Sequence, residues 1–133
     1  MKDLKFDIQH FAYNGTSGND TIENTVSSTA VYGNGGNDSI HNRGSYISKD
    51  GKIVGRGGDY VTIQSGEGKD TVYNDFGNNV KISGDAGDDY IVTTNGDHIT
   101  INGGKGIDRI TNYYGEYVVM NADEGIVGKI DEI

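Results

Sequence analysis

The chain has 133 residues, of which 22 are glycine, and it contains no proline, cysteine or tryptophan. Its 20 Asp and Glu residues outnumber 11 Lys and Arg, and the formal net charge of −9 argues against nucleic acid as a partner, because phosphate binding needs a basic surface. The lack of cysteine excludes disulfides and thiolate metal sites, and no window approaches the ~18 apolar residues of a membrane span, so we expect one small domain over residues 1–133.

Residues 1–12 are set apart from the rest of the sequence. Leu4, Phe6 and Ile8 alternate with polar residues, which predicts a strand that caps the open end of the fold. The segment lacks the apolar core and the small-residue cleavage site of a secretory signal. Lys5–Ala12 is similar to a short leader found on many phage-encoded structural proteins, and this resemblance makes a phage particle one expected location.

Residues 13–114 form a repeat whose later part has a period of 19 residues. Four segments of this length start at Gly58, Gly77, Gly96 and Gly115. Their aligned columns read Val61, Val80, Ile99, Val118; Ile63, Ile82, Ile101, Met120; Val72, Ile91, Ile110; and Gly68, Gly87, Gly106, Gly125. The pattern extends upstream to Gly15–Asn24 and Gly33–Asn42. Because a disordered glycine-rich chain does not keep such columns, the repeat indicates a folded repeat protein.

One interval in the repeat is longer than the others. Asp38 and Asp70 are separated by 32 residues, which is one period of 19 plus 13. The excess includes Tyr46–Val54, in which two alternating runs flank Asp50 and Gly51. This pattern predicts a β-hairpin inserted near residues 43–57.

Each period contains two short strands, for example Val61–Ile63 and Thr71–Tyr73. Alternation places Val61, Ile63 and Val72 inside. Such a strand pair cannot bury its apolar face alone, so the periods are expected to stack into two facing parallel sheets. We therefore predict an all-β fold, a parallel β-solenoid of about six coils, in which residues 115–133 form a C-terminal capping coil. In that coil Val127 is expected to stand at the place that aspartate holds in the other turns.

An aspartate occupies the same position in five turns: Asp20, Asp38, Asp70, Asp89 and Asp108. Stacked strands lie ~4.8 Å apart, so this column brings like charges close together. Calcium takes about six to eight oxygens from carboxylates and backbone carbonyls, and a glycine turn exposes such carbonyls. Turn formation alone accounts for the glycines but not for the aspartates. The column therefore predicts about four Ca²⁺ ions, one between each pair of successive coils.

The turns Gly84–Ile91 and Gly103–Ile110 resemble the repeat of RTX (hemolysin-type) calcium-binding proteins, which reads Gly-Gly-x-Gly-x-Asp-x-apolar-x. The nearest match is Gly35–Ile40 with the preceding Gly33. The resemblance implies a right-handed β-roll that binds calcium, and type I secretion. The metal-site residues that it implies are Asp20, Asp38, Asp70, Asp89, Asp108, Gly15, Gly18, Gly33, Gly35, Gly36, Gly66, Gly68, Gly84, Gly87, Gly103, Gly104 and Gly106.

Several turns depart from the RTX pattern. Ser65 replaces the first glycine, and Gly15–Gly18 and Gly84–Gly87 lack the second. The opposite turn of each period, such as Thr94–Asp97, has no such motif. We therefore expect calcium along one edge of the solenoid only.

A separate column consists of amides with one hydroxyl: Asn24, Asn42, Asn74, Thr93 and Asn112. Stacked amides can form a hydrogen-bond ladder along a solenoid, and asparagine also simply favours turns. The sequence supports both explanations equally, and in both the role is structural.

No catalytic set can be assembled from the sequence, so we do not expect an enzyme. His10, His41 and His98 have no zinc-type spacing and share no column. We expect calcium binding coupled to the folding of an extracellular structural module, with a weak affinity of roughly 10⁻⁴–10⁻³ M. The alternative is an adhesin or phage-associated structural protein whose solenoid face binds a carbohydrate or protein on a cell surface.

Overall fold

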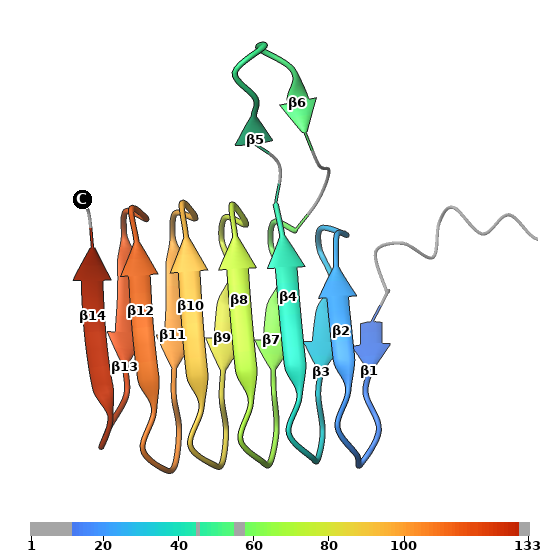
Figure 1. Ribbon diagram of the computed structural model, residues 1–133, viewed down its shortest axis with the longest axis vertical. Coiled ribbons are helices and arrows are strands. Elements are labelled where there is room, and N and C mark those ends of the chain that lie inside the picture. Colours follow the sequence, from blue (N-terminus) through green and yellow to red (C-terminus); the bar gives the residue numbers. More distant parts are fainter. Residues whose placement is uncertain (1–11, 45, 55–57, 131–133) are drawn as a thin grey trace, which may run out of the picture.

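The computed structural model describes residues 12–44, 46–54 and 58–130. These residues form two six-stranded parallel sheets and one two-stranded hairpin, without a helix (Figure 1). Sheet A contains β1 (Ala12–Asn14), β3 (Ala30–Tyr32), β7 (Thr62–Gln64), β9 (Lys81–Ser83), β11 (Ile99–Asn102) and β13 (Val118–Asn121). Sheet B contains β2 (Thr21–Asn24), β4 (Ser39–Arg43), β8 (Thr71–Asp75), β10 (Tyr90–Thr94), β12 (Arg109–Tyr113) and β14 (Ile126–Ile130).

The chain passes alternately through sheet A and sheet B, and each A strand with the B strand that follows it forms one coil. Coils 1 to 6 consist of β1 and β2, β3 and β4, β7 and β8, β9 and β10, β11 and β12, and β13 and β14. The predicted parallel β-solenoid of about six coils is therefore confirmed. No helix in the described part of the chain is long and apolar enough to cross a membrane.

The core is a narrow strip of aliphatic side chains between the two sheets. Ile63 pairs with Ile82 in sheet A, and Val72 pairs with Ile91 in sheet B. The predicted columns are thus in register, and their aliphatic members in coils 2 to 5 are almost completely buried. Burial of each such side chain contributes about 1.5–3 kcal/mol. Because each coil buries only two or three aliphatic residues, the turns at the two edges must supply much of the remaining interaction between coils.

The two edges are formed by different turns. The aspartate edge, at the bottom of Figure 1, joins each A strand to the next B strand through residues 15–20, 33–38, 65–70, 84–89, 103–108 and 122–125. The hairpin edge, at the top, joins each B strand to the next A strand. At the aspartate edge Gly68 and Gly87 have φ of 127° and 124°. A Cβ on Gly87 would lie 1.8 Å from the carbonyl oxygen of Gly68, so the stacked turns leave no room for a side chain there.

The predicted hairpin is confirmed. Strands β5 (Tyr46–Ile47) and β6 (Ile53–Val54) pair antiparallel, and the backbone N–H of Ser48 donates to the carbonyl oxygen of Lys52 at 2.8 Å. Despite the insertion, β4 and β8 pair directly, with Ile40 opposite Val72. The hairpin therefore projects from the solenoid and leaves coils 2 and 3 stacked (Figure 1).

The register predicted for the last coil is wrong. Ile110 pairs with Val127, 17 residues later, and the backbone N–H of Ile126 donates to the carbonyl oxygen of Asp108 at 2.7 Å. Val127 therefore continues the aliphatic column and does not take the position of the aspartates. A strict period of 19 would have placed Lys129 opposite Ile110. The turn is two residues shorter than the others, and this register keeps an apolar residue in line with the core column although Val127 itself is exposed.

The N-terminal strand begins at Ala12, which pairs with Ala30 in coil 2. Ala12 is thus part of the first coil and not of a separate cap. The alternating residues Leu4, Phe6 and Ile8 lie outside the described residues, as does nearly all of the leader-like segment.

Candidate metal centre

The five predicted aspartates lie at the aspartate edge, each directly before the B strand of its coil. Four of them are almost completely buried, with exposures of 1–3%: Asp38, Asp70, Asp89 and Asp108. Asp20, in the first coil, is only half-buried. The stacking of coils 1 to 5 therefore brings the predicted carboxylates into one column, as the sequence indicated.

One oxygen of each stacked carboxylate binds the backbone of the neighbouring coil. The N–H of Asp20 donates to Oδ1 of Asp38 at 2.8 Å, and the N–H of Asp38 donates to Oδ1 of Asp70 at 2.7 Å. The N–H of Asp70 and that of Asp89 each donate at 2.9 Å to the Oδ1 of the next aspartate, the last being Asp108. This continuous ladder fixes the rotamer of every carboxylate in the column.

The other oxygen, Oδ2, is buried and makes no hydrogen bond with any described residue in four cases: Asp38, Asp70, Asp89 and Asp108. In coil 2, a Cβ placed on Gly33 would lie 2.5 Å from Oδ2 of Asp38 and 2.3 Å from the carbonyl oxygen of Ser65 in the next coil. Coil 4 repeats this geometry at 2.4 and 2.5 Å, with the atoms supplied by Gly84, Asp89 and Gly103. In both coils the carboxylate Oδ2 and a carbonyl oxygen of the next coil therefore lie so close to the same glycine that a side chain would not fit between them.

Asp20 differs from the other four aspartates. The backbone N–H of Thr16 donates to its Oδ2 at 2.6 Å, and the Thr16 hydroxyl lies 3.1 Å from both carboxylate oxygens. In the described part of the chain no coil precedes the first one, and the carboxylate of Asp20 is satisfied within its own turn. Asp20 is therefore the weakest of the five predicted metal ligands.

Burial raises the pKa of each buried aspartate above its ordinary value of 3.8. The pKa of Asp70 rises to about 6 and that of Asp89 to about 7, mainly because the charged form loses its hydration. The backbone N–H groups lower both pKa values, the Ser65 hydroxyl also lowers that of Asp70, and the neighbouring carboxylates raise both. The column is therefore short of positive charge.

The donor set suits a hard cation. Carboxylate and carbonyl oxygens are the ligands that Ca²⁺ takes in proteins, and each buried Oδ2 lacks the donor or cation that such an atom normally has. No group of three or more His, Asp or Glu side chains that could hold a metal occurs among the described residues. Most ligands at each level would therefore come from the backbone, with the carboxylates supplying the charge.

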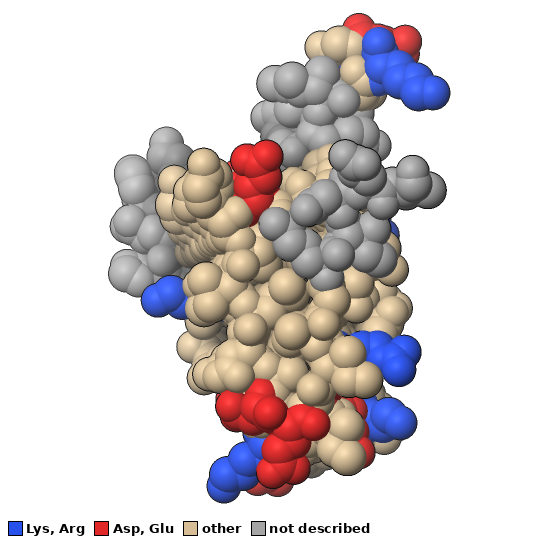
Figure 2. All heavy atoms as spheres, turned by 90° about the vertical axis from the view of Figure 1, so that its left-hand side faces the viewer, with Lys and Arg blue, Asp and Glu red and all other residues tan. Residues whose placement is uncertain are grey.

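The turn of the last coil is shorter than the others, and among the described residues this coil contributes no buried carboxylate. Asp123 and Glu124 lie in this turn and are exposed. Figure 2, which views the end of the solenoid formed by coil 6, shows acidic side chains gathered on the side away from the hairpin. These exposed groups are hydrated, and they differ in this respect from the buried aspartates.

The asparagine column forms a buried ladder, which decides between the two explanations that the sequence left open. Nδ2 of Asn24 donates to Oδ1 of Asn42 at 2.7 Å, and Nδ2 of Asn42 donates to Oδ1 of Asn74 at 2.7 Å. Nδ2 of Asn74 then donates to the hydroxyl of Thr93 at 3.0 Å. Beyond Thr93 the ladder stops, and Oδ1 of Asn112 is buried without a hydrogen-bond partner in the described structure.

Sequence reasoning missed a second ladder, at the hairpin edge. Oδ1 of Asp59 accepts the N–H of Asn78 at 2.8 Å, and Oδ1 of Asn78 accepts the N–H of Asp97 at 2.9 Å. Ser27 begins this ladder and Glu116 ends it. The signal was present, because Asp59, Asn78, Asp97 and Glu116 each follow the glycine that starts one of the four aligned segments.

The histidines do not build a site. Nε2 of His41 lies 2.5 Å from Oδ2 of Asp75 on the outer face of sheet B. His98 is exposed at the hairpin edge, and its ring stacks on that of Tyr117 with centroids 4.8 Å apart. His10 lies outside the described residues.

Comparison of the chain with protein-family models, with curated proteins and with solved structures finds no match. The fold and the aspartate column are therefore established by the chain's own geometry, and no relative identifies the repeats as RTX repeats.

Proposed function

We propose that this protein binds calcium ions between successive coils at the aspartate edge and that the ions complete the folding of the solenoid. The observation that carries the proposal is the column of buried Oδ2 atoms on Asp38, Asp70, Asp89 and Asp108, which lack hydrogen-bond partners among the described residues. Those oxygens and the carbonyls of the glycine turns would hold the ions. The likeness of these turns to the RTX repeat supports calcium as the metal.

The electrostatics of the column favour a divalent cation over an empty site. An unpaired carboxylate inside a protein loses its hydration and shifts toward its neutral form, and four of them in one column also repel one another. A bound Ca²⁺ supplies positive charge where the structure has none. It thereby stabilises the charged form of each aspartate in the folded state.

The thin core makes folding depend on this charge compensation. Two or three aliphatic side chains per coil offset only part of the conformational entropy that the coil loses on folding. Binding to the folded state alone adds stability that grows with the calcium concentration. Sites in the millimolar range fill outside cells and not in the cytosol, so we propose an extracellular location, reached by type I secretion or on a phage particle.

Circular dichroism with and without a chelator tests the proposal. With millimolar calcium the protein is expected to show β-structure, and with excess EDTA most of that signal is lost. Magnesium is the matched control, because it demands a tighter octahedral shell and keeps its waters. The proposal is contradicted if the spectrum does not change and equilibrium dialysis detects no bound calcium.

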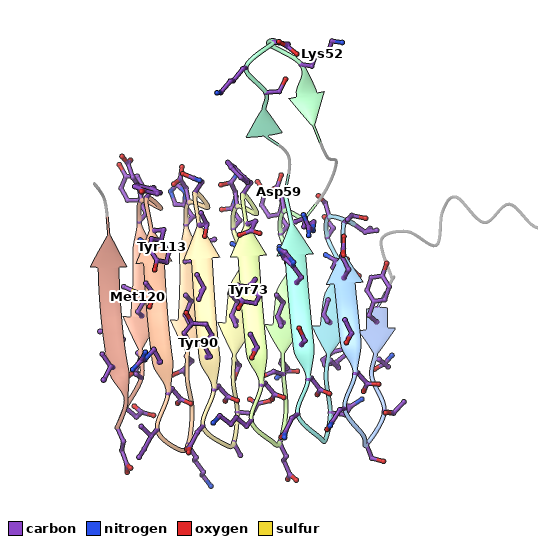
Figure 3. The ribbon with its side chains drawn as sticks, in the orientation of Figure 1. Lys52, Asp59, Tyr73, Tyr90, Tyr113 and Met120 are labelled. Atoms are coloured by element: carbon purple, nitrogen blue, oxygen red, sulfur yellow. The ribbon has the colours of Figure 1, made fainter. Side chains whose placement is uncertain are left out.

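A second candidate function is the binding of a glycan or a protein by the outer face of sheet B. Tyr73 and Tyr90 point outward from neighbouring strands with ring centroids 6.3 Å apart, and the ring of His41 lies 5.7 Å from that of Tyr73. Figure 3 shows Tyr73, Tyr90 and Tyr113 along this sheet. Adjacent aromatic rings with a polar tip are typical of recognition surfaces. A glycan array probed with the wild type and with Tyr73→Ala tests it, and equal signals would remove this candidate.

A further inference from the structure

The first position of the aspartate-edge turn differs in one coil. Coils 1, 2, 4 and 5 carry glycine there and coil 3 carries serine: Gly15, Gly33, Gly84, Gly103 and Ser65. At each glycine, a Cβ would lie only 2.3–2.7 Å from the Oδ2 of the aspartate in the same turn. At these four glycines the aspartate oxygen and the turn thus approach each other more closely than a side chain would allow.

In coil 3 the serine side chain stands at this position. Ser65 is completely buried, and its hydroxyl lies 3.1 Å from the carbonyl oxygen of Gly84 in the next coil, to which it donates. The carbonyl oxygen of Ser83 is a weaker second acceptor at 3.4 Å. Gly84 holds in coil 4 the position that Ser65 holds in coil 3. Its carbonyl oxygen therefore corresponds to the next-coil carbonyl oxygens that lie near the carboxylates of coils 2 and 4.

We propose that the Ser65 hydroxyl takes the place of a cation between coils 3 and 4, so that calcium is excluded from this level while the neighbouring levels bind it. The inference rests on the calcium binding proposed above. The hydroxyl supplies the positive end of a dipole to the Gly84 carbonyl, and its oxygen and Cβ fill the volume that an ion needs. Ser65 thus determines how many ions the column holds and divides them into two groups, on either side of coil 3.

The number of calcium ions bound per chain tests the inference, measured by equilibrium dialysis of the full chain in millimolar calcium. Ser65→Gly introduces the residue that four other coils already carry, and it is expected to raise the count by one ion. Ser65→Ala is the matched control, because it removes the hydroxyl but keeps the Cβ that fills the space, and its count is expected to equal that of the wild type. Gly84→Ser copies the coil 3 arrangement in coil 4 and is expected to lower the count by one.

The outcomes separate this inference from the proposed function. A Ser65→Gly protein that binds as many ions as the wild type overturns the inference alone, because the serine would then be a bystander. A lower count for both Ser65→Gly and Ser65→Ala also overturns it, because the hydroxyl would then be a ligand of the ion. A count of zero in every variant, the wild type included, overturns the calcium proposal itself. Circular dichroism in calcium verifies that each variant that is counted is folded.

Discussion

The two edges of the solenoid use the same kind of hydrogen bond but place it in different surroundings. At the aspartate edge a carboxylate oxygen accepts the N–H of the preceding coil, at 2.7–2.9 Å. At the hairpin edge the side chains of Asp59, Asn78 and Asp97 accept the N–H of the following coil, at 2.8–2.9 Å. Asp59 is labelled at this edge in Figure 3, and none of these three side chains is buried.

Burial, and not the number of acidic residues, makes one edge a candidate cation site. At the hairpin edge the side chains of Asp59 and Asp97 are partly exposed to solvent, and Asn78 separates their charges. At the aspartate edge the second oxygen is enclosed by the next coil and has no donor within the described structure. The same ladder is therefore complete without an ion at one edge and incomplete at the other.

The largest expected effect comes from removing one buried charge. In Asp89→Asn an amide oxygen still accepts the N–H of Asp70, and the new NH₂ group replaces Oδ2, which lies beside Gly84 as the carbonyl oxygen of Gly103 does. Without calcium this variant is expected to be more stable than the wild type by about 1–3 kcal/mol, because a buried unpaired charge is replaced by a satisfied amide. In calcium, the added stability of the wild type is expected to be largely lost. Urea unfolding with chelator and with calcium measures both effects.

Asp97→Asn is the matched replacement at the hairpin edge. Its half-buried side chain keeps the acceptor for the N–H of Glu116, so both unfolding measurements are expected to stay within about 0.5 kcal/mol of the wild type. If Asp97→Asn weakens the response to calcium as strongly as Asp89→Asn does, the two edges are equivalent and the comparison fails.

A fall in pH is expected to stabilise the metal-free protein and to weaken the stabilisation that calcium provides. The pKa of Asp70 is about 6 and that of Asp89 about 7 in the folded chain, against 3.8 when unfolded, so folding without metal takes up protons. Stability of the metal-free protein is therefore highest below pH 4 with respect to these groups and is lost as the pH rises through 6 and 7. Calcium needs the charged carboxylates, so its stabilising effect increases over the same range. Chelator titrations from pH 5 to pH 8, followed by urea unfolding, measure this, and a metal-free midpoint that rises with pH contradicts it.

The core and the aspartate column were predictable because stacking forces one residue type to recur in one column. Val72 and Ile91 must both face the core, and Asp70 and Asp89 stand at the same distance before them. From the sequence we predicted only that the like charges of the column repel one another. The sequence does not reveal which carboxylate oxygen accepts the backbone N–H and which is left without a partner.

The register of the last coil, the hairpin-edge ladder and the Ser65 hydrogen bond could not be predicted from aligned columns of one residue type. In the last coil the period of 19 would place Lys129 opposite Ile110, but Val127 pairs there, although it is 47% exposed. The hairpin-edge ladder was overlooked because aspartate, asparagine and glutamate alternate in it, although their oxygens make the same hydrogen bond. The hydrogen bond of Ser65 to the next coil is likewise invisible until the distance between the coils is known.

A smaller effect is expected from completing the asparagine ladder beside the hairpin edge. Thr93 accepts from Asn74 but leaves Oδ1 of Asn112 without a partner in the described structure. Thr93→Asn supplies both an acceptor and a donor of similar volume, so it is expected to stabilise the protein by about 0.5–1.5 kcal/mol, both with and without calcium. Thr93→Val removes the acceptor and is expected to destabilise by a similar amount. Thermal unfolding of the pair measures this, and a destabilised Thr93→Asn means that the ladder ends at Thr93 for steric reasons.

Only a small effect is expected from removing the hairpin. Deletion of residues 45–57 joins Gly44 to Gly58 and restores the spacing of 19 residues between Asp38 and Asp70. These ends already lie close, since a Cβ on Gly58 would be 2.7 Å from the backbone nitrogen of Gly44. Strands β4 and β8 pair in full without the insertion, so the change in stability is expected to be below about 1 kcal/mol, with the calcium response unchanged. A loss of that response measured by circular dichroism would mean that the hairpin edge controls the aspartate edge, because the deletion touches no residue at the latter.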